Sequence, residues 1–257
     1  MSMTQKVPRV KFIIAPLNET RNIIYRYLTE GYLQSWRDMI YREYPKLKEK
    51  LKNIMNNKIR KKVIYEFFEE PFKNKKPLLE KKTKDFQSEW NKINDDIMKA
   101  LSEIVETDWP KKDKEFIARV TLNYICTCNI KKRIFDVFYK QSFQEMKETC
   151  IHEISHFIYY EKWKQIFPKT KEKEFEPPHL VWHLLEMVPG IILNDKKIQR
   201  IFKNKFESYE EYRKLKINGR PILSYIQKFY DKRKNFEDFL KKSYEFIQKH
   251  EKEIKII

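Results

Sequence analysis

Glycine is nearly absent from this chain, and that scarcity limits the possible folds more than any other feature of the sequence. Only 3 of the 257 residues are glycine. Because glycine is the residue that adopts a positive φ without strain, tight turns can form at few positions. Apolar residues make up 41% of the chain, which is enough to build a substantial core. We therefore expect long helices joined by few tight turns, in an α+β fold that is predominantly α-helical.

The first part of the chain is expected to be helical after one short strand. Residues 10–14, VKFII, are rich in β-forming side chains and favour a strand. Asn18 can then cap a helix over about 19–43, which Pro45 ends. The sequence next predicts helices over about 46–56, 58–69 and 84–106, with a loop around EEPFKNKKP at 69–77. Residues 1–112 are thus predicted to be an N-terminal helical region.

The pattern changes at residues 115–140, where apolar and polar side chains alternate. A period of two is typical of strands that bury one face. Cys128 and Asn129 can lie in a turn between two such strands. We expect two antiparallel strands, which form a small antiparallel sheet at the start of a second region, 113–257.

A helix is predicted directly after these strands. Ser142 and Glu145 form a capping box, in which the serine oxygen accepts from the amide of Glu145 and the glutamate returns to the amide of Ser142. The helix should cover about 143–166 and end before Pro168. The sequence HEISH, from His152 to His156, lies in the middle of it.

The spacing of HEISH suits a metal site. Residues four apart lie on one face of a helix, so His152 and His156 can direct both imidazoles at one ion. Zinc binds two neutral imidazoles and a carboxylate and keeps a fourth position for water, whose pKa it lowers to near neutrality. Glu153 follows the first histidine, so its carboxylate can reach that water and act as general base and acid.

Candidates for a third ligand follow on the next helix, which Pro177 and Pro178 introduce. His179, His183 and Glu186 are spaced i, i+4 and i+7, so all three share one face of that helix. Either Glu186 or His183 can complete a three-ligand site.

These features resemble the gluzincin clan of zinc metallopeptidases. The resemblance covers about residues 115–200, which contain the strands, the HExxH helix and a second helix with a glutamate. It implies zinc ligands His152, His156 and Glu186, with Glu153 as the catalytic group and one strand within 115–140 holding the substrate backbone. It also favours Glu186 over His183 as third ligand.

The chain departs from the clan in one respect. The clan often has an acidic residue four positions after the third ligand, which supports a motif histidine, and this chain has Gly190 there. Asn194 or Asp195 can substitute for that residue. His179 or His183 can instead donate to the oxyanion of a tetrahedral intermediate, or make ordinary structural hydrogen bonds.

The charge of the chain suggests partners besides a peptide or protein substrate. The formal net charge is +18, but the lysines are spread along the sequence rather than clustered. This predicts a solvated surface with weak, salt-sensitive and non-specific binding to polyanions. Three cysteines argue against a disulfide framework, and no apolar run suits a signal peptide or a membrane span. We expect a cytoplasmic protein without membrane association.

Three function classes follow from these features. The first is a zinc metallopeptidase. The second is a zinc-binding regulatory or interaction protein without catalytic activity. The third is a basic helical nucleic-acid-binding protein in which the motif is incidental. Metal analysis separates the third class from the others, and mutation of Glu153 separates the first from the second.

Overall fold

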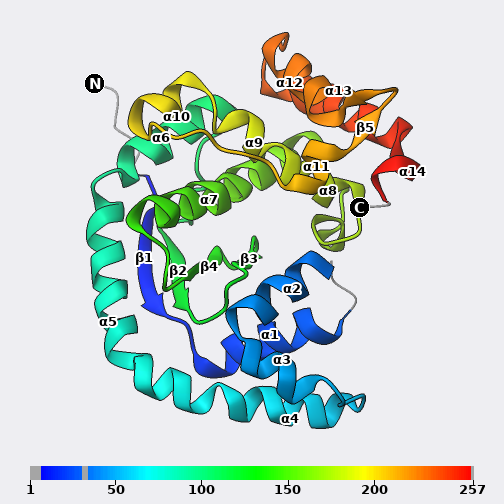
Figure 1. The fold of residues 1–257 in the computed structure, drawn as a ribbon. Coiled ribbons are helices and arrows are strands. Elements are labelled where there is room, and N and C mark those ends of the chain that lie inside the picture. Colours follow the sequence, from blue (N-terminus) through cyan, green and yellow to red (C-terminus); the bar gives the residue numbers. More distant parts are fainter. Residues whose placement is uncertain (1–6, 31–33, 256–257) are drawn as a thin grey trace. The chain divides into compact units, whose positions relative to one another are not determined.

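The computed structural model describes residues 7–30 and 34–255 as an α+β chain in which helices predominate, as predicted (Figure 1). The strands are β1 (Arg9–Ile14), β2 (Glu115–Thr121), β3 (Cys128–Asn129), β4 (Ile134–Phe138), β5 (Lys216–Ile217) and β6 (Arg220–Pro221). The helices before β2 are α1 (Leu17–Thr29), α2 (Gln34–Glu43), α3 (Pro45–Leu51), α4 (Asn57–Phe67), α5 (Glu69–Asn91) and α6 (Asn94–Val105). Those after β4 are α7 (Phe143–Ile166), a short 3-10 helix η1 (Glu172–Phe175), α8 (Leu180–Met187), α9 (Pro189–Ile192), α10 (Lys196–Ile201), α11 (Glu210–Lys214), α12 (Ile222–Asp231), α13 (Phe236–Lys249) and α14 (Glu251–Ile254).

The chain forms two compact units, and each is assembled from separate stretches of sequence. The sheet unit comprises Val10–Lys92 and Glu115–Cys150. Within the described residues, the helical unit comprises 7–9, Ile93–Lys114 and 151–255. The units therefore alternate along the sequence and do not follow the predicted regions 1–112 and 113–257.

The sheet has the order β1-β2-β4-β3 and is mixed. β2 and β4 are parallel, with Ile117 opposite Ile134 and Thr121 opposite Phe138. The prediction of two antiparallel strands over 115–140 is therefore wrong. The alternation of apolar residues was a correct sign of strands, but it fixes only which face of a strand is buried and not the direction of its partner. The connection between β2 and β4 returns to the start of β2 and contributes β3, which pairs antiparallel with β4.

Only one strand within 115–140 lies at an edge of this sheet. β2 and β4 each have a strand on both sides, which leaves β3 as the edge strand. The opposite edge is β1, and Gln87 of α5 covers it: the Phe12 amide donates to Gln87 Oε1, and Gln87 Nε2 donates to the Val10 carbonyl, both at 2.9 Å. The expected role of a strand in holding substrate stays a prediction, and among the strands of this stretch only β3 has an edge for it.

Two other expectations in the N-terminal half are corrected. Asn18 lies inside α1, which begins at Leu17, so it does not cap that helix, and α1 and α2 replace the single helix expected over 19–43. The segment 69–77 is not a loop but the first part of α5, even though Pro77 lies inside that helix. Burial explains the difference, because one face of α5 is anchored in the core by residues that lie C-terminal to the proline: Leu79, Phe86 and Trp90, each fully buried.

The helix that carries HEISH is confirmed over its full predicted range. α7 covers Phe143–Ile166, and its capping box forms as expected. The Ser142 amide donates to Glu145 Oε2 at 2.8 Å, and the Glu145 amide donates to Ser142 Oγ at 3.2 Å. The chain also turns into α8 after Pro178, with His179 at its N-cap.

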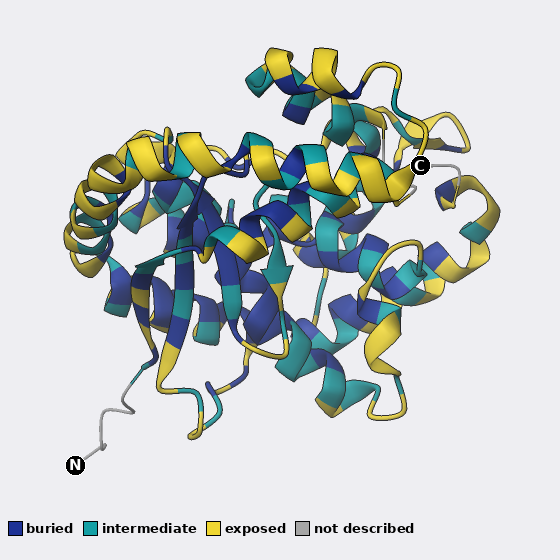
Figure 2. Cartoon of the chain, turned by 90° about the horizontal axis from the view of Figure 1, so that it is seen from below, coloured by how far each residue is buried: buried dark blue, intermediate teal, exposed yellow. Residues whose placement is uncertain are grey.

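Many helix turns carry both buried and exposed residues (Figure 2), whereas the middle of α7 has no exposed residue between Cys150 and Tyr160. In the sheet unit, Phe86 of α5 packs edge-on against Phe12 of β1, with ring centroids 6.2 Å apart. In the helical unit, α8 packs against η1, α13 and α14. None of the helices within the described residues is both long and apolar enough to cross a membrane.

Candidate metal centre

α7 places both motif histidines on one face, as their spacing requires. The Nε2 atoms of His152 and His156 lie 3.0 Å apart, within hydrogen-bonding distance. The two rings are nearly perpendicular, with centroids 4.6 Å apart. His156 is buried, with 3% of its side chain exposed, whereas 24% of the His152 side chain is exposed. The pair therefore has a closed inner side and an open outer side.

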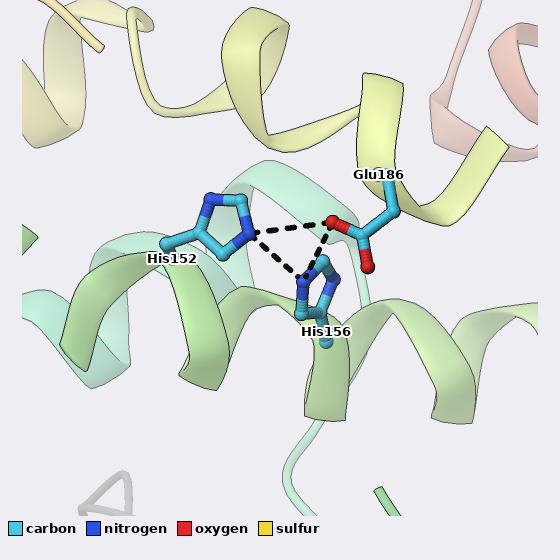
Figure 3. A group of neighbouring side chains, drawn as sticks. All are labelled: His152, His156 and Glu186. Atoms are coloured by element: carbon cyan, nitrogen blue, oxygen red, sulfur yellow. Dashed lines mark hydrogen bonds and ion pairs between the residues drawn. The ribbon is translucent and has the colours of Figure 1, made fainter. Parts of the chain in front are cut away.

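Glu186 of α8 completes a three-residue group with the histidines (Figure 3). Its Oε2 atom lies 3.6 Å from His152 Nε2 and 3.7 Å from His156 Nε2. Figure 3 shows the two imidazoles from α7 and the carboxylate from α8 directed at one another. Within the described part of the chain this is the group of histidine, cysteine or acidic side chains whose geometry suits a metal ion.

The three facing atoms fit a small metal ion. Atoms separated by 3.0, 3.6 and 3.7 Å share a common point about 2.0 Å from each, which is the length of a zinc bond to an imidazole nitrogen or a carboxylate oxygen. Glu186 Oε2 is buried and has no hydrogen-bond partner, which is unfavourable for a carboxylate oxygen unless a cation neutralises it. Two nitrogens and one oxygen at these separations can hold a metal ion, and the choice of zinc stays a prediction.

The electrostatics of the group favour a neutral His156 and an ionised Glu186, which are the forms that bind a metal, but they also favour a proton on His152, which competes with a metal. Burial lowers the pKa of His156 to about 4, so its imidazole is neutral at neutral pH. Burial raises the pKa of Glu186, but the two histidines and the Trp182 side chain outweigh it, and the net pKa lies below the ordinary value. Burial lowers the pKa of His152, but the carboxylates of Glu186 and Glu153 outweigh it, and the net pKa is raised.

Glu153 is buried on the same helix, with 7% of its surface exposed, and it is not one of the three converging residues. It is close enough for its charge to raise the pKa of His152. Glu153 is therefore a carboxylate next to a ligand in sequence and outside the ligand group. Its catalytic role stays a prediction.

His183 does not point toward the two motif histidines. It is buried, and its Nδ1 lies 3.0 Å from the hydroxyl of Tyr212. Burial lowers the pKa of His183 to about 4, which keeps this imidazole neutral. The structure thus brings Glu186, rather than His183, to the histidines of α7. His179 lies outside the group, at the N-cap of α8.

Gly190 and Asn194 have roles that the sequence did not indicate. A Cβ at Gly190 would lie 1.9 Å from Ser208 Oγ, so this glycine allows a later segment of the chain to approach α9 closely. Asn194 makes hydrogen bonds to the main chain of Phe206 and Gly190. Asp195 caps α10 and accepts from Tyr230. The side-chain hydrogen bonds of Asn194 and Asp195 are therefore made away from the motif histidines.

Tyr209 is the neighbour of the metal group that sequence reasoning missed. Its ring centroid lies 6.1 Å from that of His152, with the planes inclined by 73°, and 40% of Tyr209 is exposed. It belongs to a segment without a motif, so no local signal in the sequence pointed to it. Tyr209 thus places an aromatic ring beside the more exposed of the two histidines.

The candidate centre thus consists of two imidazoles and one carboxylate, with a second carboxylate and a tyrosine nearby. Its donor set is one that zinc and related divalent ions accept. Comparison with known proteins found no matching family model, no similar curated protein and no similar solved structure.

Proposed function

We propose that the chain is a zinc-dependent metallopeptidase of the gluzincin type, with His152, His156 and Glu186 as metal ligands and Glu153 as general base and acid. One observation carries this proposal. Ligand atoms from the HExxH helix and from the following helix converge with separations of 3.0, 3.6 and 3.7 Å. Two helices packed at random rarely direct three such atoms at one point, and a buried carboxylate oxygen without a hydrogen-bond partner, Glu186 Oε2, needs compensation.

The three ligands leave an open position on one side. A zinc ion held by the three ligands could bind a water or a substrate carbonyl at this open position. It would lower the pKa of the water and polarise the carbonyl. His156 and Glu186 form the more buried part of the group, whereas His152 is partly exposed. Water and substrate therefore have access from the side of His152 and Tyr209.

Glu153 moves the protons in this proposal. Its carboxylate takes a proton from the attacking water and delivers it to the nitrogen of the leaving amine. Burial removes most solvent from around Glu153, and this strengthens its interaction with a nearby proton donor. α7 fixes the main chain of Glu153 relative to the main chains of His152 and His156.

The test is a digest of a peptide library with zinc-loaded protein, read by mass spectrometry. The wild type is compared with Glu153→Gln, which keeps the size of the side chain but cannot take up a proton. Loss of a general base lowers the rate by about 10²–10⁴-fold. Glu148→Gln is the matched control, because Glu148 is a half-buried glutamate on the same helix and outside the metal group.

We expect cleavage by the wild type and by Glu148→Gln, and almost none by Glu153→Gln, with equal zinc content in all three. The same products from wild type and Glu153→Gln at the same rate would exclude Glu153 as the base. Bound zinc without any cleavage would instead support a binding protein that retains the site without catalytic activity.

A further inference from the structure

A short segment after α10 lies against the metal group and is held at three points. We call Phe206–Tyr212 the strap. It comprises the last part of the connection between α10 and α11 and the first turn of α11, and it carries Tyr209, whose ring lies beside His152. The residues that fix the strap are His183 of α8, Gly190 of α9 and Asn194 of the turn after α9, and they lie on either side of the ligand Glu186 in sequence.

Asn194 holds the beginning of the strap. The Phe206 amide donates to Asn194 Oδ1 at 3.1 Å, and Asn194 Nδ2 donates to the Phe206 carbonyl at 2.8 Å. The same Nδ2 also donates to the Gly190 carbonyl at 2.7 Å. One side chain therefore satisfies both main-chain polar groups of Phe206 and ties them to α9. These hydrogen bonds fix the position of Phe206 relative to Asn194, because both the amide and the carbonyl of Phe206 are held.

Gly190 and Ser208 fix the middle of the strap. A Cβ at position 190 would lie 1.9 Å from Ser208 Oγ and 3.2 Å from the Ser208 amide nitrogen. The main chain of the strap thus approaches α9 as closely as the absence of a side chain permits. This contact is two residues from Phe206 on one side and one residue from Tyr209 on the other.

Tyr212 and His183 fix the end of the strap. The Tyr212 hydroxyl lies 3.0 Å from His183 Nδ1, and Tyr212 is 2% exposed. His183 is one turn before Glu186 on α8, so the strap is joined to the helix that carries the third ligand. Between these buried anchors, Tyr209 is 40% exposed and faces the ring of His152.

The orientation of the two imidazoles depends on the side chains packed around them, because one imidazole lacks the usual hydrogen bond. A ligating histidine is normally oriented by a hydrogen bond to its second ring nitrogen. His156 Nδ1 is buried and has no such partner. Packing holds His156 in place, since only 3% of its side chain is exposed. His152 is much more exposed, and Tyr209 is the aromatic ring in contact range that can restrict its rotation.

We infer that Asn194 is a positioning residue that holds Tyr209 against His152 and thereby fixes the orientation of this metal ligand. The inference rests on the metal site of the proposed function. In this inference, packing by the strap orients His152, as a hydrogen bond to the second ring nitrogen orients the histidine in other metal sites. It also gives Gly190 a function, because a side chain there would crowd Ser208 of the strap.

The experiment uses Co²⁺ as the probe and measures its dissociation constant and visible absorption spectrum in the full chain. The variants are Asn194→Ala, Tyr209→Ala, their combination, and Tyr209→Phe. Gln199→Ala is the matched control, because the Gln199 amide also ties loop carbonyls, those of Leu193 and Asn204, but does not touch the strap. Amide hydrogen exchange over 206–212 reports on the strap without any metal.

We expect Asn194→Ala and Tyr209→Ala each to weaken Co²⁺ binding by about 10-fold or more and to change the spectrum in the same way. The combined variant should lose no more than either single one, since both act through one contact. Tyr209→Phe, which keeps the ring, should bind as the wild type does, and Gln199→Ala should leave the spectrum unchanged. Asn194→Ala should also speed hydrogen exchange over the strap.

Two results would overturn the inference alone: wild-type affinity and spectrum in both Asn194→Ala and Tyr209→Ala, or fully additive losses in the combined variant. Tyr209 is partly exposed, so its variants test the contact even if Asn194→Ala does not fold. Failure of the wild type itself to bind Co²⁺ would overturn the proposed function together with this inference. The two failures are therefore distinguishable.

Discussion

Acidification should release the metal in a single-proton step, because the two histidines differ in protonation before the metal binds. Burial lowers the pKa of His156 to about 4, so no proton has to leave this ring above that pH. Burial also opposes the charge on His152, but the carboxylates of Glu186 and Glu153 outweigh it and raise its pKa above the ordinary value of 6.5. A proton on His152 therefore competes with the metal in the neutral range.

The size of the pH effect on metal affinity follows from one competing proton. Below the pKa of His152, affinity falls about tenfold for each pH unit, or about 1.4 kcal/mol. Because the pKa of His152 lies above 6.5, affinity should fall at least about tenfold between about pH 7.5 and about pH 5.5. Because His152 carries the proton at the lower pH, the metal affinity increases as the pH rises through the pKa of His152.

Isothermal titration with Zn²⁺ at several pH values, in buffers of different ionisation enthalpy, measures both the affinity and the number of protons released. We expect a slope near one and release of about one proton per ion at the acidic end of this range. A slope near two would mean that His156 is also protonated and is not buried as described. A pH-independent affinity would mean that His152 is not a ligand.

Two further predictions concern the framework of the site. Gly190→Ala should destabilise the chain by about 1–3 kcal/mol in urea unfolding, because the new Cβ would overlap Ser208 Oγ. Ser208→Gly in the same chain should recover part of that loss, and no recovery would contradict the close approach. Ser142→Ala should lower the free energy of unfolding by about 1 kcal/mol, because the Glu145 amide loses its acceptor. Ser142→Thr should restore it, and equal stability of all three proteins would show that the cap does not contribute.

The local part of the site could be predicted from the sequence. The capping box fixed the start of α7, and four-residue spacing placed His152 and His156 on one face of it. The i+7 relation between His179 and Glu186 indicated a second helix face, and Glu186 of that face meets the histidines. These features depend on helix geometry within a few turns, which neighbouring residues determine.

The long-range part could not be predicted in the same way. The direction of β4 depends on where the chain after Thr121 returns, and alternation of residue types carries no information on that. The helical character of 69–77 depends on burial of later residues such as Phe86. Tyr209 approaches His152 only because Asn194 and His183 hold the strap, and none of these contacts has a spacing that a helix or strand period reveals.

The central claim is that His152, His156 and Glu186 form one metal site, and the metal content of purified protein tests it most directly. Wild-type chain and Glu186→Gln are each supplied with zinc at neutral pH, separated from unbound metal and measured by elemental mass spectrometry. We expect one zinc ion per wild-type chain and much less in Glu186→Gln, because the amide provides a neutral and weaker ligand than the carboxylate. Wild-type chain without any transition metal, or equal zinc in both proteins, would contradict the account.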